Sequence, residues 1–143
     1  MIEINNTTRQ KIDKKKITRV AARFFRVYKK NGAEVSLAVV GAARIRQLNK
    51  KYRKIDKATD VLSFPSGEKS GEGKYLGEVI INIQETKNPS RYEDVFWEKR
   101  SASYIFYFLL VHGLLHLVGY DDKTDKDHLA MLKRGEKFLA GVL

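Results

Sequence analysis

Hydrophobic and polar positions alternate with two different periods along this chain. Apolar residues three or four positions apart predict a first helix over residues 13–31, closed by Gly32, and a second helix that carries Ile45, Leu48 and Tyr52. Apolar or β-branched runs of strand length follow each of these helices, at residues 35–40, 61–64 and 75–82. The first part of the chain therefore predicts helices interleaved with strands.

Helical spacing takes over after residue 82. Ser90 and Glu93 match the capping box of a helix start, so we expect a helix of about seven turns from Ser90 to Val118. Thr124 and the acidic residues after it predict the start of a last helix that runs to the C-terminus. The glycine-rich, charged residues 66–74 predict a hairpin-like connection that contributes nothing to the core.

These elements suit a single domain. The chain has 143 residues, a size at which one core buries about two thirds of the unfolded surface. We predict one α+β domain over residues 1–143, a small mixed sheet packed with helices. The N-terminus carries no secretion pattern, and the most apolar run, residues 104–120, is shorter than the roughly 20 residues that cross a bilayer. We therefore expect a cytoplasmic protein without membrane contact.

Charge and cysteine content narrow the chemistry. The chain has 28 Lys and Arg against 17 Asp and Glu, a net charge of +11, which attracts polyanions such as nucleic acids. The first predicted helix is strongly basic, and such a face either follows an RNA backbone or simply keeps the protein soluble. No cysteine occurs, which excludes disulfides and thiolate metal sites. Any metal ion must be held by histidine and carboxylate side chains.

Two of the three histidines lie four residues apart in an apolar helical run. His112 and His116 therefore project from one helix face and can share one metal ion. Gly119 is placed to end the helix, so that Asp122 can return to the same ion. Paired core histidines are often only packing, but imidazoles in an apolar helix need partners for their ring nitrogens. Three ligands and one open position are typical of catalytic zinc.

Gly113 separates this zincin-like site from the metalloproteases. In zincins the residue after the first histidine is the glutamate that acts as general base. Gly113 has no side chain that could take a proton, although it can also serve close helix packing. The HxxxH helix therefore predicts metal chemistry without the usual proteolytic base.

Three blocks of the sequence resemble the YbeY endoribonucleases, bacterial rRNA maturation factors that bind zinc. The run from His112 to Asp121, HGLLHLVGYD, is similar to the metal signature of that family, the run from Leu48 to Pro65 ends in TDVLSFP, and the run from Leu76 to Asn82 is similar to the strand that follows. The resemblance implies one zinc ion, RNA as substrate and the ribosomal subunit as partner. It also implies single-strand-specific cleavage in 16S rRNA 3′ end maturation and in ribosome quality control.

The third metal ligand departs from that family, which has a histidine where this chain has Asp122. A carboxylate binds zinc at about the same distance as an imidazole, but its negative charge makes the metal a weaker Lewis acid. His128 is the second candidate, with a solvated place on the last helix as its simpler interpretation, and Asp121 is the third. The expected order is Asp122, then His128, then Asp121.

The second block supplies candidates for substrate contact. A guanidinium suits a phosphate through two parallel hydrogen bonds, so Arg53 is expected to act with His112 in catalysis and to neutralise the scissile phosphate. Its alternative is an exposed helix-end residue among lysines. Ser63 is expected to contact substrate, and Asp60 either assists or caps a turn. Two other functions remain open: hydrolysis of a different phosphoester, or ribosome assembly by an RNA-binding factor with a structural metal.

Overall fold

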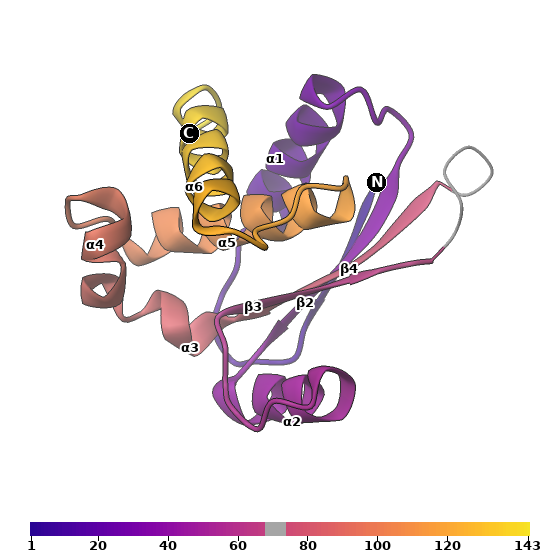
Figure 1. Ribbon diagram of the computed structural model, residues 1–143. Coiled ribbons are helices and arrows are strands. Elements are labelled where there is room, and N and C mark those ends of the chain that lie inside the picture. Colours follow the sequence, from indigo (N-terminus) through magenta and orange to yellow (C-terminus); the bar gives the residue numbers. More distant parts are fainter. Residues whose placement is uncertain (68–73) are drawn as a thin grey trace.

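The computed structural model describes residues 1–67 and 74–143, and in them one four-stranded sheet of order β1-β2-β4-β3 (Figure 1). Strands β1 (Ile2–Asn6), β2 (Glu34–Val40) and β4 (Tyr75–Asn82) run parallel, and β3 (Val61–Pro65) pairs with β4 in the antiparallel sense. The predicted single α+β domain with a small mixed sheet is confirmed.

Helices cover both faces of this sheet (Figure 1). Helix α2 (Ala42–Arg53) lies on one face, while α1 (Lys14–Val27), α5 (Ala102–Leu117) and α6 (Asp125–Ala140) lie on the other. Alternate residues of β4 divide between the two cores: Val79 and Ile81 pack into the larger one, and Ile80 into the smaller one under α2. Helix α5 packs against the sheet as well as against α1 and α6, which explains why it is apolar nearly all round.

The predicted seven-turn helix is wrong in its first part. The structure has α3 (Ile83–Thr86), a 3₁₀ turn at Pro89–Tyr92 and the short α4 (Glu93–Phe96) before α5. Trp97 ends α4 with a φ of 59°, in the left-handed region. The real cap of α5 is Ser101, whose hydroxyl oxygen accepts the Tyr104 N–H at 3.1 Å. The helix start predicted at Ser90 is wrong because Ser101 provides a serine cap closer to the apolar run.

Two more boundaries differ at the N-terminal end. Helix α1 ends at Val27 rather than near Gly32, because Lys29 takes a φ of 56° and the Lys30 N–H bonds back to the Phe25 carbonyl at 2.7 Å. Strand β1 was missed. It is short and half polar, and its pairing with β2, which places Ile2 opposite Val35, cannot be read locally.

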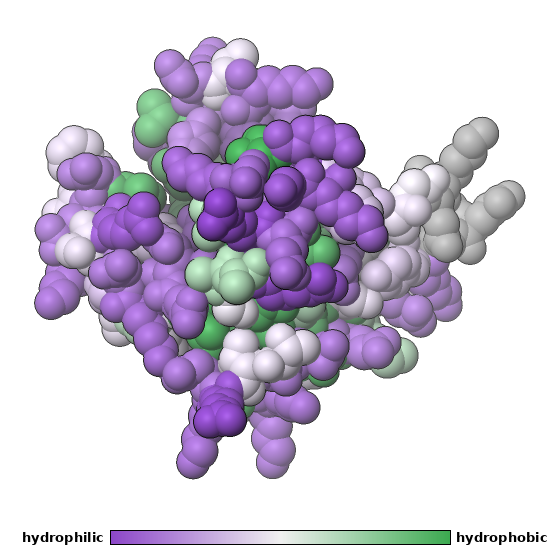
Figure 2. Space-filling view, turned by 90° about the horizontal axis from the view of Figure 1, so that it is seen from below, coloured by the Kyte–Doolittle hydropathy of each residue, from purple (hydrophilic) through white to green (hydrophobic). Residues whose placement is uncertain are grey.

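The remaining elements follow their predictions. Thr124 caps α6, its hydroxyl oxygen accepting the Asp127 N–H at 3.1 Å. Strands β3 and β4 form the expected hairpin, whereas residues 68–73 of the predicted connection lie outside the described residues. Within residues 1–67 and 74–143, no helix is long and apolar enough to span a bilayer. The face seen from below, on the α2 side, is mostly hydrophilic, with hydrophobic groups confined to small areas (Figure 2).

Candidate metal and phosphate site

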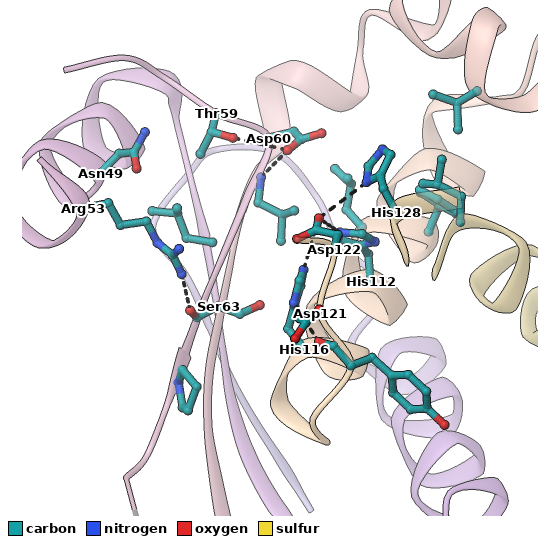
Figure 3. Close-up of a pocket in the computed structure, with 18 of the residues that line it drawn as sticks. Asn49, Arg53, Thr59, Asp60, Ser63, His112, His116, Asp121, Asp122 and His128 are labelled. Carbon is teal, nitrogen blue, oxygen red and sulfur yellow. Dashed lines mark hydrogen bonds and ion pairs between the residues drawn. The ribbon is translucent and has the colours of Figure 1, made fainter. Parts of the chain in front are cut away.

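A cavity of about 670 Å³ opens between two walls (Figure 3). One wall is the C-terminal half of α5 with the loop to α6, and the other is β3 with the end of α2. Every candidate residue of the sequence lines this cavity: Arg53, Asp60, Ser63, His112, His116, Asp121, Asp122 and His128. Residues up to 75 positions apart are thus brought to one place.

Helix geometry and a glycine build the α5 wall. His112 and His116 lie one turn apart, with ring centroids 4.9 Å apart. The helix ends in a Schellman motif: the Tyr120 N–H bonds to the Leu115 carbonyl at 3.0 Å, and the Gly119 N–H to the His116 carbonyl at 3.1 Å. Gly119 has a φ of 106°, which a side chain would strain. This turn sends the chain back over the helix end with Asp122 facing the histidines.

The donor atoms of this wall are close enough for one ion. Asp122 Oδ2 lies 4.0 Å from His112 Nε2 and 3.8 Å from His116 Nε2, and one donor atom from each of the three residues lies within 4.8 Å of the others. Ligands around a tetrahedral zinc ion with bonds of ~2.1 Å are about 3.4 Å apart. Small side-chain rotations bring the three donors to that spacing, so the set fits a metal ion.

The burial of His112 and the hydrogen bond of His116 both favour metal binding at their Nε2 atoms. Burial, and then the neighbouring His116, lower the pKa of His112 to about 4, so this ring is neutral at pH 7. His116 Nδ1 lies 3.1 Å from the Tyr120 carbonyl oxygen, which can only accept, so Nδ1 carries a proton and Nε2 is the nitrogen that could bind a metal ion. Among the residues that the structure describes, His112 Nδ1 is buried without a hydrogen-bond partner, and Nε2 is the ring nitrogen that faces Asp122 and could bind a metal ion.

The other two candidate ligands lie at the rim. His128, half exposed on α6, has Nδ1 3.5 Å from Asp122 Oδ2, nearer to that oxygen than either helix α5 histidine. Asp121 is exposed, and its carboxylate lies 3.5 Å from the Lys123 N–H. The geometry groups Asp122 with the α5 pair and places His128 beside the Asp122 carboxylate.

Gly113 packs where a protease would have its base. A Cβ at this position would lie 2.5 Å from Val79 Cγ1 and 3.2 Å from Ser63 Oγ. The Ser63 hydroxyl donates to the Gly113 carbonyl at 3.2 Å, so strand β3 and helix α5 touch at this point. No side chain fits here, and the glycine serves close packing as well as excluding the zincin glutamate.

Arg53 lies on the wall of the cavity that is opposite the α5 wall (Figure 3). Its Nη2 donates to the Ser63 carbonyl at 2.8 Å, and its guanidinium carbon lies 5.6 Å from the centre of the Phe64 ring. One hydrogen bond uses one of the five N–H donors of a guanidinium. The side chain is therefore oriented by β3 and keeps further donors for an anion in the cavity.

Asp60 is held by partners that the sequence did not reveal. Its carboxylate accepts the Val61 N–H at 2.8 Å and the Tyr92 hydroxyl at 2.9 Å. Burial, and then Asp60, raise the pKa of Tyr92, which stays a neutral donor. Tyr92 lies in the segment predicted as continuous helix, and Tyr120 acts through its backbone carbonyl, so neither left a side-chain pattern to recognise.

Sequence comparisons identify relatives along nearly the whole chain. A family model described as Endoribonuclease YbeY matches residues 3–142. The protein named endoribonuclease YbeY from Anaeromyxobacter sp. is 39% identical over 114 residues, which cover 80% of this chain and 57% of that protein. The one from Aquifex aeolicus is 34% identical over 135 residues, covering 94% of this chain and 87% of the relative.

A solved structure agrees with the fold. The solution structure of TM1509 from Thermotoga maritima superposes with a TM-score of 0.64 and 26% identity, covering 99% of this chain and 89% of that one. The chain spans little more than half the length of some relatives, such as the Anaeromyxobacter proteins at 57% and 56%, and most of the length of others.

Proposed function

The chain belongs to the YbeY endoribonuclease family, and from this we propose that it is a zinc-dependent endoribonuclease acting on single-stranded ribosomal RNA. The observation that carries the proposal is the convergence of His112, His116 and Asp122 within one cavity whose opposite wall presents Arg53. The relatives named endoribonuclease supply the class of substrate. Its place of action is then the cytoplasm, on ribosomal subunits, in maturation of the 16S rRNA 3′ end and in ribosome quality control.

The ligand set fits zinc. Two imidazoles and one carboxylate with an open fourth position are the donors of a catalytic zinc site. Bound there, zinc supplies a Lewis acid that polarises a phosphoryl oxygen or lowers the pKa of a water. Asp122 adds a negative charge that a histidine would not, which moderates that acidity.

The chain's own residues divide the remaining work. Arg53 approaches the phosphate from the other wall and offsets the charge that develops on its oxygens during cleavage. The Ser63 carbonyl orients Arg53, and the Ser63 hydroxyl fixes β3 against α5 beside His112. Substrate contact by Ser63 itself stays a prediction. Asp60 lies at the cavity wall, held by Tyr92, where it can orient a water.

Chelation and reconstitution test this function against its alternatives. Purified protein is treated with chelator, then resupplied with zinc, and assayed on a single-stranded RNA oligonucleotide and on bis(p-nitrophenyl) phosphate. We expect RNA cleavage that disappears with chelation and returns with zinc. Turnover of the small diester without RNA cleavage would indicate another phosphoester substrate. A lower melting temperature after chelation, with no RNA cleavage at any stage, would indicate a structural metal in an RNA-binding factor.

A further inference from the structure

A second cavity, of about 580 Å³, lies between helices α1 and α6. Tyr120 separates it from the α5 wall of the first cavity. Its basic and aromatic lining comes from both helices and from the loop after α5: Arg23, Tyr28, Lys29, Tyr120, Arg134 and Lys137. The other lining residues that the structure describes are apolar or glycine, and none of them is acidic. We propose that this basic cavity binds the sugar-phosphate backbone of the RNA strand beyond the cleaved bond, an inference that rests on the proposed ribonuclease function.

Charge is the first support. Four cationic side chains surround the basic cavity, and none of them takes part in an ion pair among the described residues. The chain from Lys14 to Lys30 holds eight basic residues and no acidic one, so α1 adds no compensating charge. Uncompensated cations around a concave surface focus a positive potential, which favours a polyanion.

Aromatic rings provide the second support. The Arg134 guanidinium lies 4.5 Å from the centre of the Tyr120 ring, and the Tyr28 ring meets Tyr120 edge to face at 6.0 Å. A guanidinium stacked on a ring is held flat and still carries donors for phosphate. Cations interleaved with aromatic rings are typical of grooves that hold single-stranded nucleic acid.

Position is the third support. Tyr120 belongs to both cavities: its carbonyl oxygen accepts the His116 Nδ1 proton at 3.1 Å, while its ring forms a wall of the basic cavity. An RNA strand that continues from the α5 wall past Tyr120 therefore enters the basic cavity directly. RNA bound in the basic cavity would also contact Tyr120, whose carbonyl orients His116. Such a contact couples RNA binding to the geometry of the proposed metal site.

Another explanation for these cations is that they complement the C-terminal ends of the two helices. Lys137 lies in the last turn of α6, and Lys29 lies two residues beyond the end of α1 at Val27, where positive charge is favourable for the helix dipole. That effect operates without a ligand and does not require the cations to face one cavity. The experiment must therefore separate position in the cavity from total charge.

Binding of a single-stranded uridine 20-mer to the chelated, metal-free protein provides this separation, because it requires no cleavage. The variant Arg23→Glu/Lys137→Glu reverses one cavity residue on each helix. The control Lys15→Glu/Lys99→Glu makes the same change in net charge at exposed residues that do not line the cavity. The charge-preserving variant Arg23→Lys/Lys137→Arg guards against misfolding, and thermal melting confirms that all three fold.

We expect the cavity variant to bind RNA about tenfold more weakly than the control. The slope of log affinity against log salt concentration should become shallower by about 1.4 relative to the control, because two fewer phosphates of a single strand are neutralised by the protein. Equal weakening in both variants overturns the inference in favour of long-range attraction. Competition by polyglutamate as strong as by RNA overturns it in favour of an acidic protein partner. Failure of the proposed ribonuclease function shows instead as wild-type RNA binding without zinc-dependent cleavage.

Discussion

The two walls of the cavity that contains His112 and His116 differ in burial and in what holds their side chains. On the α5 wall the His112 and His116 side chains are only 12% and 26% exposed, and the helix and the Tyr120 carbonyl fix them. On the α2 wall Arg53 is exposed and is oriented by one carbonyl of β3. Metal ligands need fixed geometry, whereas a phosphate-binding side chain must stay reachable from solvent. This difference supports the proposal that the α5 wall holds the metal and that the α2 wall contacts the RNA.

Removal of a ligand on the α5 wall should have the largest effect. In His116→Ala only two of the three donors remain, so we expect purified protein without bound zinc and RNA cleavage no faster than in chelated wild type. Metal analysis and a cleavage assay on the same preparation measure both. Full zinc content together with normal cleavage in His116→Ala would mean that the metal lies elsewhere.

Arg53→Ala should distinguish the function of the α2 wall from that of the α5 wall. We expect cleavage to fall by about 10²–10³, because a preorganised charge is removed from the phosphate, while zinc content stays at the wild-type level. Arg53→Lys is the matched control: it keeps the charge but not the paired donors, so its rate should be intermediate. Normal cleavage by Arg53→Ala would contradict the role given to the α2 wall.

Low pH should destabilise the metal-free protein because His112 is buried on the α5 wall. The folded pKa of His112 is about 4, against 6.5 for an ordinary histidine, so between these values the unfolded state takes up a proton that the folded state does not. This residue's share of the free energy of unfolding is therefore unchanged above pH 6.5 and falls by about 3 kcal/mol as the pH drops to 4. Urea unfolding of metal-free wild type and His112→Asn measures it as the difference between their pH profiles. Parallel profiles would contradict the burial argument.

The smallest effect is expected where the two walls touch. Ser63→Ala removes the hydrogen bond to the Gly113 carbonyl, so we expect the free energy of unfolding to fall by about 1 kcal/mol with zinc content unchanged. Chemical denaturation measures the decrease. If Ser63→Ala instead raises KM for RNA without changing stability, the hydroxyl contacts substrate, as the sequence alone suggested.

Much of this comparison could be predicted from local sequence. Helical spacing placed His112 and His116 on one face, and Gly119 marked the turn that returns Asp122. Strands β2, β3 and β4 were likewise visible as short apolar runs, because alternation and β-branching are local properties.

Other parts depend on contacts between distant residues. Strand β1 is defined by its pairing with β2, and the break before α5 by the left-handed turn at Trp97, which has no glycine to announce it. His128 has the pattern of a surface helix residue, yet it lies 3.5 Å from Asp122 because α6 packs against α5. Such positions follow from tertiary packing, which the sequence does not display.

The proposed third ligand, Asp122, is the part of the metal site that can be tested most directly. Zinc content is measured in wild type, Asp122→Ala and His128→Ala, and cobalt-substituted samples report the coordination by their visible absorption. We predict that Asp122→Ala loses its zinc and that His128→Ala keeps it with a wild-type cobalt spectrum. Full zinc occupancy in Asp122→Ala, or loss of zinc in His128→Ala alone, would contradict the proposed site.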